Sequence, residues 1–210
     1  MIERIGSVTE AEALLVGTDA AVFDLDDTLY SEKDYVRSGF EAAAALFPDM
    51  PDAAGRLWKA FESGKPAFDE VFGGSEESLR AAEALRVYRN HTPRIRLYPG
   101  VREMLTRLHA GKKLGLITDG RPEGQRAKTA ALGIEELFDE IIITDELGGP
   151  EHRKPSPEAF ELMSRRLNVP FGRMAYIGDN ISKDFTAPEK LGIRCIWFSN
   201  TDGLYYKERK

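Results

Sequence analysis

The sequence predicts an α/β fold, in which helices cover a parallel sheet and a separate α-helical domain is inserted after an early strand. Two observations predict it. After residue 100, short apolar runs alternate with segments of helical period, a pattern typical of parallel strands joined by right-handed crossovers. Between residues 31 and 92 the helical period dominates, and no strand-like run interrupts it.

The first strand is expected at residues 20–23, where an apolar run leads directly into a polar loop that begins at Asp24. Ahead of this run, Thr9 and Glu12 have the spacing of a capping box. This spacing predicts a short helix before the strand.

The segment 31–93 is expected to form the inserted helical domain. Its apolar side chains recur on one face, as at Val36, Phe40 and Phe47. Proline and glycine residues divide the segment into three or four predicted helices. The sheet domain is then built from residues 1–30 and 94–210.

The second part of the sheet domain is expected to alternate helices with strands. Val101, Met104, Leu105 and Leu108 have helical spacing, and so do Phe160, Met163 and Leu167. A further helix is predicted at 125–132, and strands are predicted at 113–118, 140–144, 174–178 and 193–198.

Polar side chains follow three of the predicted strands, in the segments 23–28, 116–120 and 176–180. A fourth segment, 152–157, brings Lys154 to a loop that enters a helix. Because ligands of open α/β sheets bind at the carboxyl ends of the strands, these segments are expected to converge.

Together the four segments resemble the signature motifs of the haloacid dehalogenase (HAD) superfamily, in the right order along most of the chain. Asp-Leu-Asp-Asp-Thr-Leu at 24–29 and Gly-Asp-x₄-Asp at 178–184 carry most of the resemblance. It implies a Rossmann-like, HAD-like sheet core. It also implies that the helical insertion is similar to the C1-type cap of the phosphatase branch, which closes over the site and excludes water.

Phosphate-ester chemistry explains these residue types. A carboxylate that attacks a phosphate monoester meets negative charge, so cations must screen both groups. Asp24 is the expected nucleophile, and it forms an aspartyl-phosphate. Asp26 is the expected general acid for the leaving oxygen and then the base for water. Asp27 is expected to support the loop rather than to catalyse.

A magnesium ion is the expected cofactor, because Mg²⁺ prefers hard oxygen ligands. Asp24 and Asp179 are the expected carboxylate ligands, and the resemblance implies that Asp26 adds its backbone carbonyl. Asp184 is expected to bind a metal-bound water or to orient Lys154. The alternative for Asp184 is a cap of the following helix.

The phosphate is expected to be bound by Thr118 through its hydroxyl, with the amides of Asp119 and Gly120 nearby. Lys154 is expected to stabilise both the nucleophile and the transferring group. The segment 145–153 before this lysine is longer than the usual family pattern.

The resulting hypothesis is a magnesium-dependent phosphatase that hydrolyses a small phosphate monoester. A phosphomutase of the same superfamily would return the phosphoryl group to a sugar instead, and this alternative stays open. A dehalogenase is less favoured, because carboxylate attack at carbon needs neither Asp26 nor the acidic metal loop. A catalytically silent binding domain is also less favoured, because all the reactive residues are present.

The resemblance implies a small phosphorylated substrate as the partner, and the composition argues against other classes of partner. The formal net charge of −6 argues against a nucleic-acid polymer. No apolar run reaches the roughly 18 residues of a membrane span, and none near the N-terminus resembles a signal peptide, so a cytoplasmic location is expected. Cys195 is expected to be a buried core residue, and the charged tail 207–210 is expected to be solvated. No feature specifies an oligomeric state.

Overall fold

The computed structural model describes residues 2–73 and 78–206, so the predicted solvated tail 207–210 lies outside the described residues. The chain divides into two compact units, Met1–Glu32 with Arg96–Lys210, and Lys33–Ile95. The domain boundaries predicted from the sequence lie within two residues of these divisions.

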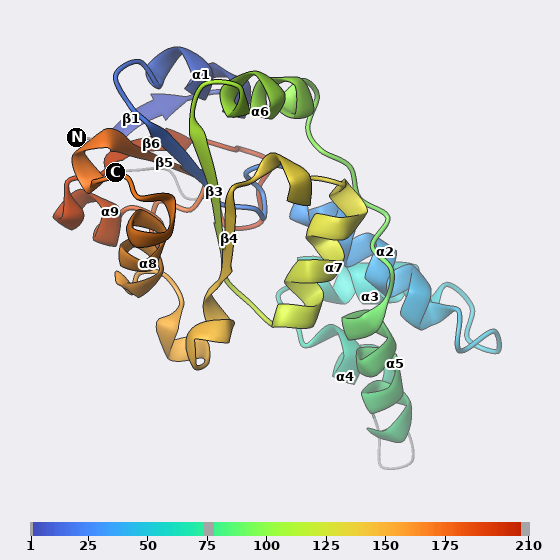
Figure 1. Ribbon diagram of the computed structural model, residues 1–210. Helices are drawn as coiled ribbons and strands as arrows, with labels where there is room; N and C mark the ends of the chain where they lie inside the picture. The colour runs from blue at the N-terminus through green and yellow to red at the C-terminus, as the bar shows by residue number, and fades with distance from the viewer. Residues whose placement is uncertain (1, 74–77, 207–210) are drawn as a thin grey trace. The chain divides into compact units, whose positions relative to one another are not determined.

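The first unit contains a parallel sheet, which confirms the predicted α/β fold (Figure 1). Within the described residues the sheet has six strands in the order β1-β6-β5-β2-β3-β4. Their bounds are β1 Ile2–Ile5, β2 Ala20–Phe23, β3 Lys113–Thr118, β4 Glu140–Ile143, β5 Met174–Gly178 and β6 Arg194–Phe198. The central strands β2 and β5 are buried along their whole length, as expected when helices cover both faces of a parallel sheet.

The helices of this unit are α1 Ala11–Leu14, α6 Val101–His109, α7 Pro122–Leu132, α8 Glu158–Leu167 and α9 Thr186–Leu191. In Figure 1, α1 and α6 lie on one side of the sheet, and α8 and α9 lie on the other. Phe160 and Met163 of α8 belong to a buried cluster with Val22, Ile117 and Tyr176 of the strands. Full burial of such a side chain stabilises the fold by about 1.5–3 kcal/mol.

Two details near the N-terminus differ from the sequence prediction. The strand β1 was not predicted; its alternating Ile2, Glu3, Arg4 and Ile5 are too short a run to separate from a loop without knowledge of the partner β6. The short helix is present, but the capping box is wrong. Thr9 lies inside the 3₁₀ turn Val8–Glu10 and its hydroxyl contacts that of Ser7, while Glu12 pairs with Arg107.

The second unit is helical, and the described residues contain four helices, as the sequence predicts. These are α2 Glu32–Ala44, α3 Ala53–Glu62, α4 Ala67–Phe72 and α5 Ser78–Asn90. Phe40 of α2 is the centre of their core, where its ring contacts those of Phe61, Phe68 and Tyr88 at centroid distances of 5.5–6.0 Å. Across both units, no described helix combines the length and the apolar character that a membrane span requires.

Candidate active site

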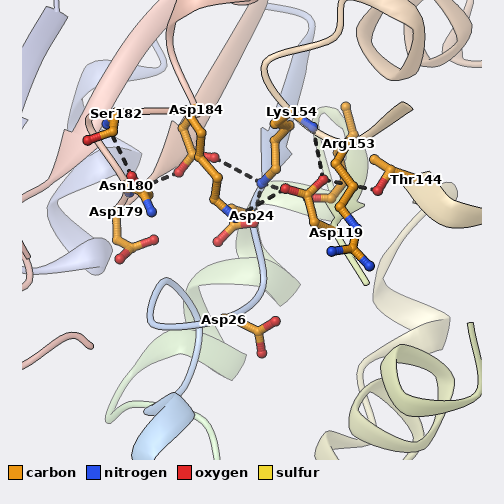
Figure 2. A network of polar contacts seen from close by, with 12 residues as sticks. Asp24, Asp26, Asp119, Thr144, Arg153, Lys154, Asp179, Asn180, Ser182 and Asp184 are labelled. Carbon is orange, nitrogen blue, oxygen red and sulfur yellow. Dashed lines mark hydrogen bonds and ion pairs between the residues drawn. The ribbon is translucent and has the colours of Figure 1, made fainter. Parts of the chain in front are cut away.

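The predicted aspartates and Thr118 come from the carboxyl ends of three neighbouring strands, and Lys154 comes from the loop between β4 and α8. Phe23, the last residue of β2, is aligned with Leu116 of β3 and Ile177 of β5. The residues that follow, Asp24 above all, therefore emerge at one edge of the sheet (Figure 2). The Asp24 amide continues the ladder by donating to the Ile177 carbonyl at 2.9 Å, which fixes the backbone of the proposed nucleophile.

Three carboxylates meet at this edge. Asp24, Asp179 and Asp184 are buried, and each offers an oxygen within 4.8 Å of the others. The Thr28 hydroxyl donates to Asp24 Oδ2 at 3.1 Å, and the backbone amide of Asn180 donates to Asp184 Oδ2 at 2.9 Å. The backbone approaches so closely that a Cβ at position 178 would lie 2.5 Å from Asp184 Oδ2, which explains Gly178.

The electrostatics of this cluster call for a cation. Burial raises the pKa of Asp24 to about 6, even though the Lys154 ammonium opposes the shift. Burial and then the charge of Asp24 raise the pKa of Asp179 to about 9. Among the described residues, the three buried carboxylates have a single buried lysine in contact with them. Their oxygens are the hard donors that Mg²⁺ prefers, and a bound cation would favour their ionised forms. The donor set therefore fits the expected metal.

Lys154 contacts two of these three carboxylates. Its side chain is fully buried, and its ammonium contacts the Asp24 carboxylate and lies 2.9 Å from Asp184 Oδ1. It also donates to the Tyr176 hydroxyl at 2.9 Å. Burial alone would lower the pKa of Lys154, but Asp184 and Asp24 hold it well above its usual value. The lysine is thus a permanent cation beside Asp24.

The long approach to Lys154 is folded into two 3₁₀ turns, Thr144–Leu147 and Pro150–His152. Arg153 binds the Asp145 carboxylate through two hydrogen bonds of 2.7 Å each. The extra residues relative to the family pattern therefore form a braced loop that brings Lys154 into the sheet edge.

Thr118 ends β3 and is completely buried. Within the described part of the chain its Oγ1 has no hydrogen-bond partner. A buried hydroxyl without a partner costs about 1–3 kcal/mol, so such groups are rare unless a ligand satisfies them. This hydroxyl is therefore ready to donate to a phosphoryl oxygen.

Asp119 has a structural part in the loop. Its Oδ1 accepts hydrogen bonds from the Thr144 hydroxyl at 3.0 Å and the Lys154 amide at 3.1 Å. Its Oδ2 accepts one from the Lys183 ammonium at 3.1 Å. Gly120 follows with a φ of +130°, and a Cβ there would lie 2.8 Å from Gln125 Nε2. Asp119 thus binds Lys154 through its side chain, and its backbone carbonyl accepts a hydrogen bond of 2.9 Å from Gln125 near the start of α7.

Asp26 is the site residue that the structure does not bring into the cluster. Figure 2 shows its carboxylate apart from Asp24 and Asp184. Its Oδ1 accepts from Lys128 at 2.7 Å and from the Tyr30 hydroxyl. Burial would raise the pKa of Asp26, but Lys128 and Tyr30 hold it below its usual value. The carboxylate faces α7 in this structure.

Sequence reasoning missed Lys128, Lys183 and Tyr176, although all three contact predicted site residues. Lys183 carries a local signal, because it directly precedes Asp184 in the acidic motif. Lys128 and Tyr176 carry none, since an isolated lysine on a helix or tyrosine in a strand is common. Their partners are set by the fold.

The fold and the site define an α/β protein with a buried carboxylate and lysine centre at the carboxyl edge of its sheet. A family model for haloacid dehalogenase-like hydrolases matches residues 18–192. The chain therefore belongs to this family of hydrolases.

The relatives are phosphatases. Glyceraldehyde 3-phosphate phosphatase of Methanocaldococcus jannaschii is 31% identical over 188 residues, which cover 82% of this chain and 81% of the relative. Phosphoserine phosphatase of Thermus thermophilus is 31% identical over 134 residues, 63% of this chain and 51% of the relative. Among solved structures, the magnesium-bound HAD hydrolase YfnB of Bacillus subtilis has a TM-score of 0.58 at 21% identity, with 86% of both chains covered.

Proposed function

We propose that this chain is a magnesium-dependent phosphatase that hydrolyses a small phosphate monoester through an aspartyl-phosphate on Asp24. One observation carries the proposal. The Asp24 carboxylate contacts the Lys154 ammonium and clusters with two further buried carboxylates, and the neighbouring strand ends in Thr118, whose hydroxyl has no partner among the described residues. This arrangement offers a nucleophile, a fixed cation and a phosphate donor at one place.

In the first step an Asp24 oxygen attacks phosphorus, and the bond from phosphorus to the leaving oxygen breaks. Asp26 starts this step protonated and gives its proton to that oxygen, so that the alcohol departs and Asp26 becomes a carboxylate. In the second step Asp26 takes a proton from water, whose oxygen attacks phosphorus and breaks its bond to Asp24. Inorganic phosphate leaves, and the Asp24 carboxylate is restored. Lys154 and Thr118 hold the phosphoryl oxygens throughout.

Asp24 and Asp179, with Asp184 beside them, are the residues that would hold Mg²⁺, together with the Asp26 carbonyl that the family pattern implies. When bound, the ion neutralises charge on the nucleophile and on the phosphoryl group. The magnesium-bound relative YfnB supports the choice of metal. Lys154 orients Asp24 through their ion pair.

The substrate class follows from the relatives, which act on glyceraldehyde 3-phosphate and phosphoserine. Both substrates are small phosphate monoesters. We infer a substrate of the same class for this chain, and we assign the helical segment 31–93 the part of a C1-type cap.

The test measures release of inorganic phosphate from sugar phosphates, phosphoserine and glyceraldehyde 3-phosphate, with and without Mg²⁺. The wild-type chain is expected to be active with the metal, and mass spectrometry is expected to find a phosphorylated Asp24. Asp24→Asn is expected to lose both signals, with Asp27→Asn as the control. Normal turnover by Asp24→Asn would eliminate the proposed nucleophile. Formation of an isomeric sugar phosphate instead of inorganic phosphate would identify a phosphomutase.

A further inference from the structure

Lys128 is a buried charged residue that the proposed reaction leaves without a part. It lies on α7, and its side chain is only 5% exposed. Its ammonium lies 2.7 Å from Asp26 Oδ1. Removing an ammonium from water costs several kcal/mol unless a partner offsets it, so this pair is not an incidental surface contact.

Two further donors bind the same carboxylate. The Tyr30 hydroxyl, which is completely buried, also donates to Asp26 Oδ1. Gln125 Nε2 lies 3.3 Å from Asp26 Oδ2 and donates to the Asp119 carbonyl at 2.9 Å. Three donors from two parts of the chain thus fix the place and the plane of one carboxylate.

Helix α7 connects these donors to the phosphate loop. Gln125 and Lys128 are three residues apart and so share one face of the helix. The helix begins at Pro122, directly after the loop of Thr118 and Gly120. The loop and the two side chains that bind Asp26 therefore belong to one continuous segment, which Gln125 ties together by donating to the Asp119 carbonyl.

We propose that Lys128 is a positioning residue for Asp26, and that Tyr30 and Gln125 assist it. Lys128 acts through Asp26 by holding the carboxylate in one orientation between the two proton transfers. The proposal rests on the phosphatase function proposed above, because it assigns Asp26 the acid and base steps.

The kinetic test is a double-mutant cycle of Lys128→Met and Asp26→Asn. In the wild-type background Lys128→Met is expected to lower kcat on an alkyl phosphate about 10- to 100-fold, since a misplaced catalytic group costs about that much. KM is expected to change less than about threefold, because Lys128 does not bind the substrate. In the Asp26→Asn background Lys128→Met is expected to cost less than about threefold. An equal loss in both backgrounds, or no loss in either, would overturn the proposal.

Matched variants separate positioning from folding. Lys128→Arg keeps a cation and is expected to recover part of kcat, whereas Lys190→Met, at an exposed lysine of α9, is expected to behave as wild type. If Lys128→Met does not fold, Tyr30→Phe replaces it in the same cycle, because it removes one donor from the same oxygen. Loss of kcat in Tyr30→Phe that persists without Asp26 would count against the proposal.

A second readout does not depend on activity. In a crystal structure of Lys128→Met, or of Tyr30→Phe if the first does not fold, the Asp26 carboxylate is expected to leave its present position. An unmoved carboxylate would overturn the positioning role even in an active phosphatase. If the carboxylate moves in the variant but the wild-type chain releases no phosphate, the positioning of Asp26 by Lys128 stands. Only the phosphatase hypothesis is then rejected.

Discussion

The Lys154 ammonium lies 2.9 Å from the Asp184 carboxylate, and neither side chain has any exposed surface. The same ammonium contacts Asp24, so one lysine holds two buried carboxylates in place. Asp184 is thereby a partner of Lys154 as well as a member of the acidic cluster. The stability of the site and its chemistry therefore depend on the same ion pairs.

Lys154→Met is expected to destabilise the metal-free protein by about 3–5 kcal/mol, because it leaves Asp24 and Asp184 buried without their cation. Urea unfolding without Mg²⁺ measures the change. The exposed Lys190→Met is the control, and it is expected to stay within about 0.5 kcal/mol of wild type. A loss below about 1 kcal/mol in Lys154→Met would mean that the ion pairs contribute little.

The metal-free protein is expected to lose stability as the pH rises from about 5 to about 8. Burial raises the pKa of Asp24 to about 6 and that of Asp179 to about 9, so the folded chain binds more protons than the unfolded chain in this window. The free energy of unfolding therefore falls as the pH rises, because the folded state binds more protons than the unfolded state. Carboxyl groups with a lowered pKa, such as that of Asp119, change the stability only at pH values below this window.

Urea midpoints at about pH 5 and about pH 8, with and without Mg²⁺, measure this dependence. Mg²⁺ needs ionised Asp24 and Asp179, so the stabilisation that it provides is expected to grow as the pH rises. Metal-free stability that increases across the window would contradict the raised pKa values.

Thr118→Val is expected to leave the stability unchanged or to raise it by up to about 1 kcal/mol, because it removes a buried hydroxyl that has no partner in the described chain. The inhibition constant for inorganic phosphate is expected to rise about tenfold, which corresponds to about 1.4 kcal/mol.

The matched control for this change is Thr144→Val. Thr144 is equally buried, but its hydroxyl donates to Asp119, so its loss is expected to cost about 1–3 kcal/mol. Thermal or urea unfolding of both variants gives the comparison. Similar destabilisation of the two would show that the Thr118 hydroxyl is satisfied within the protein.

Asp27→Ala is expected to lower the stability by about 2–4 kcal/mol, because its carboxylate accepts the amides of Glu32 at 2.8 Å and Leu204 at 2.7 Å. Position 27 also has a φ of 55°, which alanine adopts poorly and asparagine tolerates. Asp27→Asn is therefore expected to lose less than half as much and to keep kcat within about tenfold. A loss of kcat as large as that of Asp26→Asn would give Asp27 a catalytic part.

The sequence predicted the sheet, and it pointed to Asp24, Asp179 and Lys154, which lie close together in the structure, because each of these features has a local signal. Apolar runs of strand length end in polar residues, and parallel strands place those ends together. Asp27 also fits its predicted supporting part, since it accepts backbone amides of the loop and of residue 204. Cys195 is buried, as predicted.

The surroundings of Asp26 could not be predicted in the same way. Its contact with Lys128 joins residues that are 102 positions apart, and nothing in the spacing links them. The strand β1 has the same difficulty, because its pairing with β6 defines it better than its own four residues do. For Thr9 and Glu12 the local pattern was present but the prediction was wrong. Thr9 lies in a 3₁₀ turn and Glu12 pairs with Arg107, so neither side chain caps the helix.

The pairing of β1 with β6 has a consequence for the order of folding during synthesis. Ile2 is aligned with Cys195 and Ile5 with Phe198, so the ladder joins residues from opposite ends of the chain. The ribosome must release β6 before β1 has a partner, whereas β2 and β3 are able to pair much earlier. β6 and β1 are therefore expected to join the sheet last, and until then β5 is an edge strand with unpaired backbone groups.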